Sequence, residues 1–154
     1  MPRSTLIPLL TLGAAPLLLA LAGCAPMQMQ SVVVATDNAP KAIGPYSQAI
    51  RSGPMLFLAG QIPIDPKTNQ LLVGTIEQET TLVLNNLKAV LEANGMTMAN
   101  VVSTSVFMKD LNDFPKMNTV YGTYFEKAPP ARATVEVARL PRDVKVEISA
   151  IAVK

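Results

Sequence analysis

The most regular pattern in the chain lies between residues 129 and 153, where apolar and polar residues alternate in two segments. A period of two places successive side chains on opposite faces of a β-strand. In the first segment the apolar positions are Ala133, Val135 and Val137, and the polar positions are Arg132, Thr134 and Glu136. In the second segment the apolar positions are Val146, Ile148 and Ala150, and the polar positions are Lys145, Glu147 and Ser149. Each segment is predicted to be a strand with one apolar face.

Arg132 and Glu147 are the charged residues of most interest in these strands. A guanidinium and a carboxylate on strand-forming sequence are candidates for a polar site built on rigid backbone. Both also fit solvent-facing charges on half-exposed strands, where charged residues are common. The alternation by itself leaves both interpretations open.

Shorter signals predict the remaining strands. Strand-like segments cover residues 31–36, 47–51, 55–59 and 101–108, with residues 52–54 turning the second into the third. A turn at residues 65–69 precedes a short apolar segment at residues 71–73.

The strongest helix signal covers residues 76–94. Thr75 and Gln78 have the spacing of a capping box, and Gly95 supplies a left-handed stop. One buried face is predicted by the helical spacing of Ile76, Leu82 or Val83, Leu87, Val90 and Leu91. The residues expected mainly on the solvent side are Asn85, Asn86 and Lys88.

A second helix is predicted from Asp113, as its cap, to about residue 127. Its apolar face consists of Phe114, Met117, Tyr121 and Tyr124 or Phe125. We interpret these aromatic rings as core rather than as a stacking platform for a ligand.

The order of elements predicts an α+β domain with both helices packed on one face of a single sheet. The other face would then carry apolar strand residues without helix cover. Self-association is the simplest way to bury them, with Val135, Val137, Val146 and Ile148 expected in the contact.

The first residues differ in character from the rest of the chain. Residues 1–23 combine one basic residue, Arg3, with a Leu- and Ala-rich run and small residues at its end, which is typical of a signal peptide. The run is short and contains Pro8 and Pro16, which disfavours a membrane-spanning helix. The ending Leu-Ala-Gly-Cys resembles a bacterial lipobox in which Cys24 becomes lipidated. We therefore expect a lipidated Cys24, a tether over residues 24–33, a domain over residues 34–154, and export to the periplasmic side of a bacterial membrane.

Composition removes several kinds of chemistry. The 154-residue chain has no histidine and one cysteine, Cys24, so histidine-based triads, histidine-ligated zinc and cysteine clusters are excluded. The formal net charge is +2 and no basic run or aromatic platform accompanies it, so no nucleic-acid partner is expected. Any catalysis must use carboxylates, Arg, Lys, Tyr, hydroxyls, backbone groups and water.

Five stretches in order carry a family resemblance: residues 42–50 (AIGPYSQAI), 58–70 (LAGQIPIDPKTNQ), 106–118 (VFMKDLNDFPKMN), 121–132 (YGTYFEKAPPAR) and 129–153. Together they closely resemble the RidA (also called YjgF) family of enamine and imine deaminases. The resemblance implies a chorismate-mutase-like fold, a homotrimer, and sites in the clefts between subunits. It implies no metal and no organic cofactor.

The resemblance also implies roles for individual residues. Arg132 matches an arginine that grips the substrate carboxylate, and Glu147 matches a glutamate that positions or activates water. Tyr46 matches a tyrosine that lines the cleft from a neighbouring subunit, although it also fits a buried ring with a satisfied hydroxyl. Asn118 matches an asparagine near the pocket, and Gly60 matches a glycine whose backbone can approach a ligand closely. Thr134 stands where many members have cysteine, and a threonine hydroxyl can still hold a water. Ala59 stands where many have serine, so a hydroxyl donor is lost.

The two C-terminal strands cannot form a simple hairpin and a joint site together. A hairpin centred on residues 141–142 would place Glu147 opposite Glu136, setting like charges against each other. Arg132 and Glu147 would then lie about four residues, or roughly 13 Å, apart along the sheet. A shared site needs another strand order or a second subunit. The resemblance implies that these strands are not simple hairpin neighbours.

Two functions remain open. The first is an enzyme that hydrolyses 2-enamine or 2-imine acids, such as 2-aminoacrylate, to 2-oxo acids and ammonium. The second is a lipid-anchored trimer that binds small carboxylates, or acts as a chaperone-like stress protein, without turnover. Export favours the second, because reactive enamines arise mainly in the cytoplasm. The presence of both Arg132 and Glu147 favours the first, since capture alone needs only the arginine.

Overall fold

The computed structural model describes residues 30–154, which form one six-stranded sheet and two α-helices. The strands are β1 (Ser31–Val34), β2 (Ala49–Ser52), β3 (Met55–Gln61), β4 (Val101–Met108), β5 (Ala131–Glu136) and β6 (Val146–Val153). The helices are α1 (Ile76–Ala93) and α2 (Phe114–Tyr124). The predicted signal peptide, Cys24 and most of the tether lie outside the described residues. No helix within residues 30–154 is long and apolar enough to cross a membrane.

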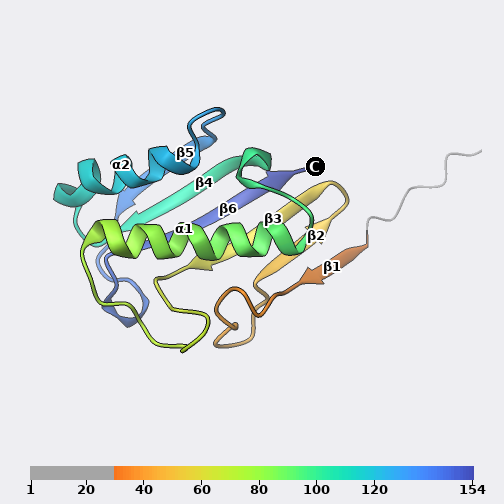
Figure 1. Cartoon of the computed structure of the whole chain (residues 1–154), viewed down its shortest axis with the longest axis horizontal. Coiled ribbons are helices and arrows are strands. Elements are labelled where there is room, and N and C mark those ends of the chain that lie inside the picture. The colour runs from red at the N-terminus through yellow and green to blue at the C-terminus, as the bar shows by residue number, and fades with distance from the viewer. Residues whose placement is uncertain (1–29) are drawn as a thin grey trace, which may run out of the picture.

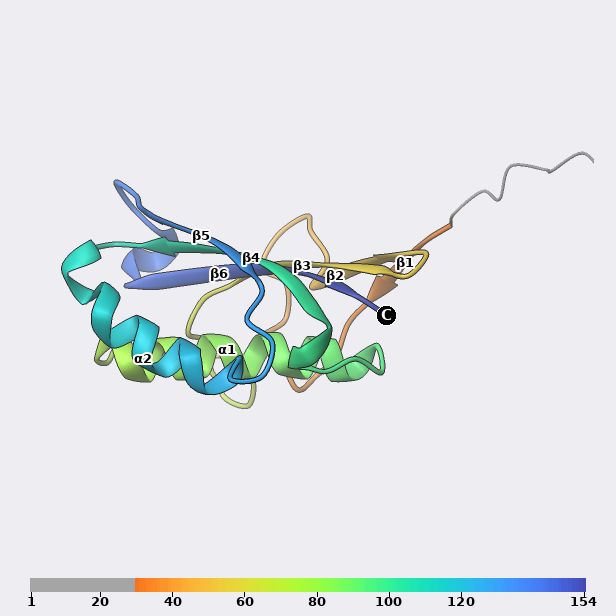
Figure 2. The same cartoon turned by 90° about the horizontal axis from the view of Figure 1, so that it is seen from above.

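Both helices pack on the same face of the sheet, as predicted (Figures 1 and 2). The Thr75 side chain accepts a hydrogen bond from the Gln78 backbone, and the Gln78 side chain accepts one from the Thr75 backbone at 2.9 Å, which completes the capping box. Gly95 follows α1 with φ +66°, the left-handed conformation that a glycine adopts without strain. Helix α2 ends at Tyr124, earlier than the expected residue 127.

The sheet order is β1-β2-β3-β6-β4-β5. Strand β6 lies between β3 and β4 and is antiparallel to both, while β5 is the edge strand and runs parallel to β4. The two C-terminal strands are therefore not neighbours, and the clash of Glu147 with Glu136 does not arise. Instead Glu147 lies opposite Phe107, and Arg132 lies beside Thr104.

Alternation along β6 assigns its residues to two faces. Val146 and Ile148 are fully buried beneath the helices at 0% exposure, so their expected place in a subunit contact is wrong. Glu147 and Ser149, on the opposite face, remain partly exposed. The physical reason is that the apolar stripe of β6 packs on α1, the helix it contacts.

The face without helices, which we call the open face, is nevertheless apolar. Phe57 on β3 is 42% exposed and Val135 on β5 is 44% exposed. Phe107 joins Val135 to Glu147 across β4 in one row of the open face. Large apolar side chains of this kind on a sheet face indicate an interaction surface.

Two polar residues differ from the sequence expectation. Asn86 is buried, not solvent-facing, because its Nδ2 donates to the carbonyl of Ile64 at 3.0 Å. Lys145 does not extend beside Glu147: its Nζ contacts the buried carboxylate of Glu79 on α1 at 3.1 Å. The Lys145 backbone N–H also donates to Glu79, at 2.8 Å, and this fixes the start of β6 against the helix.

Candidate active site

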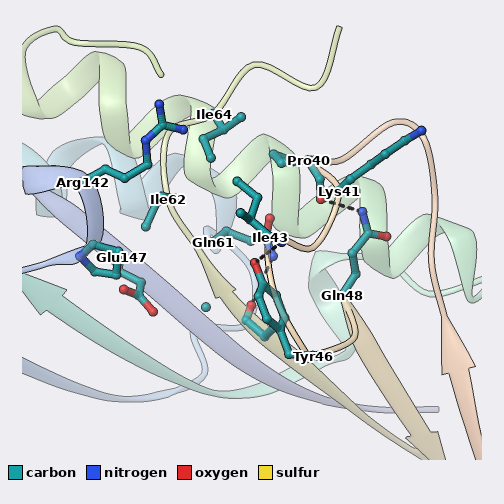
Figure 3. Close-up of a pocket in the computed structure, with 13 residues that line it drawn as sticks. Pro40, Lys41, Ile43, Tyr46, Gln48, Gln61, Ile62, Ile64, Arg142 and Glu147 are labelled. Carbon is teal, nitrogen blue, oxygen red and sulfur yellow. Dashed lines mark hydrogen bonds between the residues drawn. The ribbon is translucent and has the colours of Figure 1, made fainter. Parts of the chain in front are cut away.

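Three of the predicted site residues, Tyr46, Gly60 and Glu147, line one cavity of about 550 Å³ (Figure 3). The cavity lies between the end of β3, the start of β6 and the loop that precedes β2. Its lining residues are Pro40, Lys41, Ile43, Tyr46, Gln48, Ala59, Gly60, Gln61, Ile62, Ile64, Pro141, Arg142 and Glu147. Apolar side chains form most of this wall, and Glu147 is the carboxylate on it.

A β-bulge brings Gly60 against Glu147. The register of β3 with β6 shifts between Leu58 and Gln61, which leaves an extra residue at Ala59–Gly60. A Cβ atom on Gly60 would stand 2.9 Å from the Glu147 carboxylate carbon and would collide with the carboxylate. Bulges of this kind often re-aim side chains beside functional sites. The absence of a side chain at Gly60 therefore leaves room for the Glu147 carboxylate. This is a separate role from the close approach of the Gly60 backbone to a ligand that the sequence led us to expect.

The Glu147 carboxylate lies in a partly desolvated position. Within residues 30–154 it forms no hydrogen bond and no ion pair, and desolvation raises its pKa above the ordinary value for glutamate. A carboxylate with a raised pKa holds a proton more readily and is a stronger base when ionised. This is the property needed for proton transfer to and from water.

The loop that carries Tyr46 is held by a residue that the sequence did not point to. Gln48 is buried, and its Nε2 donates to the carbonyls of Thr36, Ala39 and Pro40 at 3.0, 3.2 and 2.7 Å. Its Oε1 accepts from the Thr36 backbone at 2.7 Å. The available signal was its place in the stretch GPYSQ, two residues after Tyr46.

Tyr46 is not a buried ring. It is 51% exposed, and its hydroxyl accepts a hydrogen bond from the Ile43 backbone at 3.1 Å. The ring faces the cavity with one hydroxyl contact already fixed. The interpretation of Tyr46 as core is therefore wrong.

The other predicted residues, Arg132, Asn118 and Thr134, lie together on the helix side of β5. Arg132 Nη2 donates to Asn118 Oδ1 at 2.8 Å. The guanidinium carbon stands 4.5 Å from the ring centre of Tyr121 and 5.5 Å from that of Phe114. The α2 aromatics thus form a platform under a cation as well as core, which the sequence interpretation missed.

Thr134 lies two residues further along β5 on the same side. Its hydroxyl oxygen is shielded from solvent and has no hydrogen-bond partner within residues 30–154. Tyr121, beneath Arg132, shares a buried hydrogen bond of 2.7 Å with Thr104, and burial raises the pKa of Tyr121. The Arg132 guanidinium thus packs on a tyrosine ring that is itself held by a buried hydrogen bond.

One chain does not bring Arg132 and Glu147 together. Arg132 pairs with Thr104 and Glu147 pairs with Phe107 on the shared neighbour β4. Residues 104 and 107 differ by an odd number, so their side chains point to opposite faces of the sheet. The chain therefore carries two half-sites: the Glu147 half-site on the open face and the Arg132 half-site beside α2.

Within residues 30–154 no group of three or more acidic or cysteine residues is arranged to hold a metal ion. The chemistry available in the described part of the chain is that of a half-buried carboxylate, a stacked guanidinium, hydroxyls and water. Together, the fold and these half-sites define a small α+β protein with a partly desolvated carboxylate in a cavity and a stacked guanidinium on the opposite face of the sheet.

Comparison with known proteins is consistent with this class. The family model described as Endoribonuclease L-PSP matches residues 36–154. A RutC family protein of Pyrococcus horikoshii is 57% identical over 122 residues, which cover 79% of this chain and 97% of the relative. The 2-iminobutanoate/2-iminopropanoate deaminase of Salmonella typhimurium is 48% identical over 127 residues, covering 80% of this chain and 98% of the relative.

Among solved structures, E. coli TdcF with bound serine has a TM-score of 0.77 and 43% identity, covering 80% of this chain and 98% of the other. The chain belongs to the RidA (YjgF) family.

Proposed function

We propose that three copies of this chain assemble through their open faces and that each active site combines the Arg132 half-site of one copy with the Glu147 half-site of its neighbour. The separation of the two residues on opposite faces of one sheet is the observation that carries this proposal. A cation without an ion pair and a partly desolvated carboxylate on different surfaces complement each other only between copies. The apolar open face supplies the contact.

We propose that the reaction is hydrolytic deamination of 2-enamine and 2-imine acids. Two relatives support this substrate class: one is named an imine deaminase, and another was solved with an amino acid bound. Arg132 would bind the substrate carboxylate. Asn118 accepts from one Nη, which leaves the other guanidinium donors for two parallel charge-assisted hydrogen bonds.

Glu147 would move the protons. An enamine first accepts a proton on carbon from the protonated Glu147 carboxyl and loses one from nitrogen to the resulting carboxylate, which gives an imine with an electrophilic carbon. The water oxygen then bonds to the imine carbon while Glu147 accepts a proton from that water. Glu147 returns the proton to the nitrogen. The carbinolamine so formed loses ammonia and leaves the 2-oxo acid.

Subunit mixing tests the shared site. Arg132→Ala and Glu147→Gln proteins should each be nearly inactive toward an imino acid generated by an amino-acid oxidase. When the two are unfolded, mixed and refolded together, random reassembly restores both residues at about one site in four. Activity near one quarter of the parent is therefore expected. If the mixture stays as inactive as its components, the two residues do not act across a subunit boundary.

The binding-module alternative is favoured by the signal-like residues 1–23 alone. It predicts that the parent protein binds small 2-oxo acids but does not accelerate imine loss. The coupled oxidase assay on residues 31–154 separates the two functions directly, because the spontaneous rate is measured in the same assay.

We also propose that the mature protein is a lipoprotein anchored through Cys24 on the periplasmic side of the membrane. The support is the sequence Leu21-Ala22-Gly23-Cys24 after an apolar run. Cys24→Ala should abolish lipid attachment and move the protein out of the membrane fraction. Mass spectrometry of the native N-terminal peptide checks this, and an unmodified N-terminus at Met1 would contradict it.

A further inference from the structure

The cavity of the Glu147 half-site contains a cation that the reaction described above does not use. Arg142 lines this cavity together with Glu147, Ile62 and Ile64. Figure 3 shows its side chain extending towards Ile64, on the side away from the Glu147 carboxylate. Ile62, Ile64 and Pro141 contribute apolar lining to the same cavity. The cavity thus has a carboxylate in one part and a guanidinium in another.

The backbone holds Arg142 in a conformation that most residues avoid. Its φ is 57° and its ψ is 20°, and the next residue, Asp143, has φ 60°. Two consecutive left-handed residues other than glycine are strained, and such strain persists where the surroundings enforce it. At the surface, Arg139 donates to both carboxylate oxygens of Asp143, at 2.6 and 2.9 Å.

The turn is also fixed from below. Leu140 and Val144, on either side of it, are buried, and the Asp143 N–H donates to the Leu140 carbonyl at 3.1 Å. The backbone of the turn is therefore anchored on both sides by buried residues, while Arg142 itself is exposed at the cavity.

The Arg142 guanidinium is available to an anion. Within residues 30–154 it forms no hydrogen bond and no ion pair. Lys41 also lines the cavity, but its ammonium lies 3.7 Å from Asp37 and points away from the cavity in Figure 3. Lys41 is therefore a suitable control residue, because it is a cation that lines the same cavity but does not point into it.

We propose that Arg142 is a specificity-determining residue that binds an acidic group at the far end of the substrate side chain, so that the accepted substrates include dicarboxylic 2-imino acids. This inference rests on the function proposed above. With the α-carboxylate on Arg132 of the neighbouring copy and the reacting carbon near Glu147, a longer side chain extends along the apolar wall. A terminal carboxylate then meets a planar guanidinium that can bind it with two hydrogen bonds.

Calorimetric binding of product-like 2-oxo acids tests the assignment. Oxaloacetate, 2-oxoglutarate and 2-oxoadipate are compared with 2-oxobutanoate, 2-oxopentanoate and 2-oxohexanoate, on the chain from residue 31 onward. We expect at least one of the dicarboxylates to bind about tenfold or more tightly than the monocarboxylate of the same chain length. A tenfold difference in affinity is the usual effect of one charge-assisted hydrogen-bonded contact. The preferred length reports how far Arg142 lies from the α-carboxylate position.

Substitutions at Arg142 distinguish the effect of its charge from the effect of its left-handed backbone conformation. Arg142→Asn keeps a residue type that tolerates the left-handed conformation and should reduce the dicarboxylate preference about tenfold. Arg142→Glu should reverse that preference. Lys41→Gln removes the other rim cation and should leave the preference unchanged.

The outcomes are distinct. Equal binding of dicarboxylates and their neutral matches by the parent, or an unchanged preference in Arg142→Asn, overturns the assignment while the deaminase proposal stands. A parent that does not accelerate imine loss in the coupled oxidase assay overturns the proposed function itself. Dissociation of the assembly in Arg142→Asn, seen by light scattering, would assign Arg142 to a subunit contact instead.

Discussion

The guanidinium of Arg132 packs on aromatic rings on one side and has hydrogen-bond donors without partners, within residues 30–154, on the other. Its guanidinium rests over Tyr121 and Phe114 and donates to Asn118, which holds the planar fork in one orientation. A lysine ammonium is a point charge that would neither stack as well on the rings nor form two parallel contacts. The orientation of the guanidinium is therefore the one that the proposed carboxylate contact needs.

Arg132→Ala is expected to lower kcat/KM for imino acids by about two to three orders of magnitude, because a desolvated bidentate contact contributes about 2–4 kcal/mol. Arg132→Lys should restore little of this loss. The matched control is Arg51→Ala, since Arg51 is exposed on β2. Titration with 2-oxo acids checks the cause: unchanged affinity in Arg132→Ala would remove the carboxylate clamp.

The raised pKa of Glu147 predicts that the free energy of unfolding depends on pH. Desolvation raises its pKa in the folded protein, so ionisation is less favourable there than in the unfolded chain. Its contribution to stability is fully present below the ordinary value of 4.5 and is lost as the pH rises through the higher folded pKa. Glu147→Gln avoids this loss.

Urea unfolding at one protein concentration should therefore show the Glu147→Gln variant gaining stability relative to the parent as the pH rises above about 4.5. The same substitution should slow turnover while retaining 2-oxo acid binding, because an amide cannot accept a proton from water. A stability difference that is flat with pH would show that Glu147 is not desolvated. Full turnover in Glu147→Gln would exclude its role as a base.

At the scale of elements, the bulge in β3 links the strand to the site. Gly60→Ala places a methyl group against the Glu147 carboxylate, which lies at the end of a flexible side chain and can move. The fold should persist, whereas displacement of a catalytic group by about 1 Å can reduce the rate about a hundredfold. Steady-state kinetics with thermal unfolding measures both effects.

Gly122→Ala is the matched control, because a Cβ there meets nothing within 4 Å. In the interior of α2 it should stabilise the protein by about 0.5–1 kcal/mol and leave turnover unchanged. Gly60→Ala with parental kinetics would show that the closeness of Gly60 and Glu147 has no part in the reaction.

At the scale of the whole molecule, the open face is the proposed contact between copies. Phe57 lies near the middle of it, exposed and apolar in the single chain. Phe57→Lys buries a charge in the proposed contact and is expected to yield a monomer in light scattering, at about one third of the parent mass. Deaminase activity should fall with the mass, since the proposed site combines residues of two copies.

The control is Ala93→Lys, which adds the same charge to an exposed position at the end of α1. It should keep the parent mass. A parent domain that is monomeric at every concentration would exclude both the trimer and the shared site.

Several features followed from the sequence because they depend on neighbouring residues. The α1 capping box, the Gly95 stop and the alternation in β5 and β6 are local patterns, and all are present in the structure. The motifs also placed the chain in the correct family and gave the correct fold. The assignment of Asn86 to solvent failed because its partner, the Ile64 carbonyl, is distant in sequence.

Tertiary structure alone decided which residues share a surface. Alternation shows that a strand has two faces but does not show which face receives the helices, so Val146 and Ile148 were placed in the wrong contact. The strand order set Arg132 and Glu147 on opposite faces of one sheet. The left-handed turn at Arg142 and Asp143 likewise had no clear sequence signal. These features depend on pairing between distant segments, and the energies that select that pairing arise only when the chain packs.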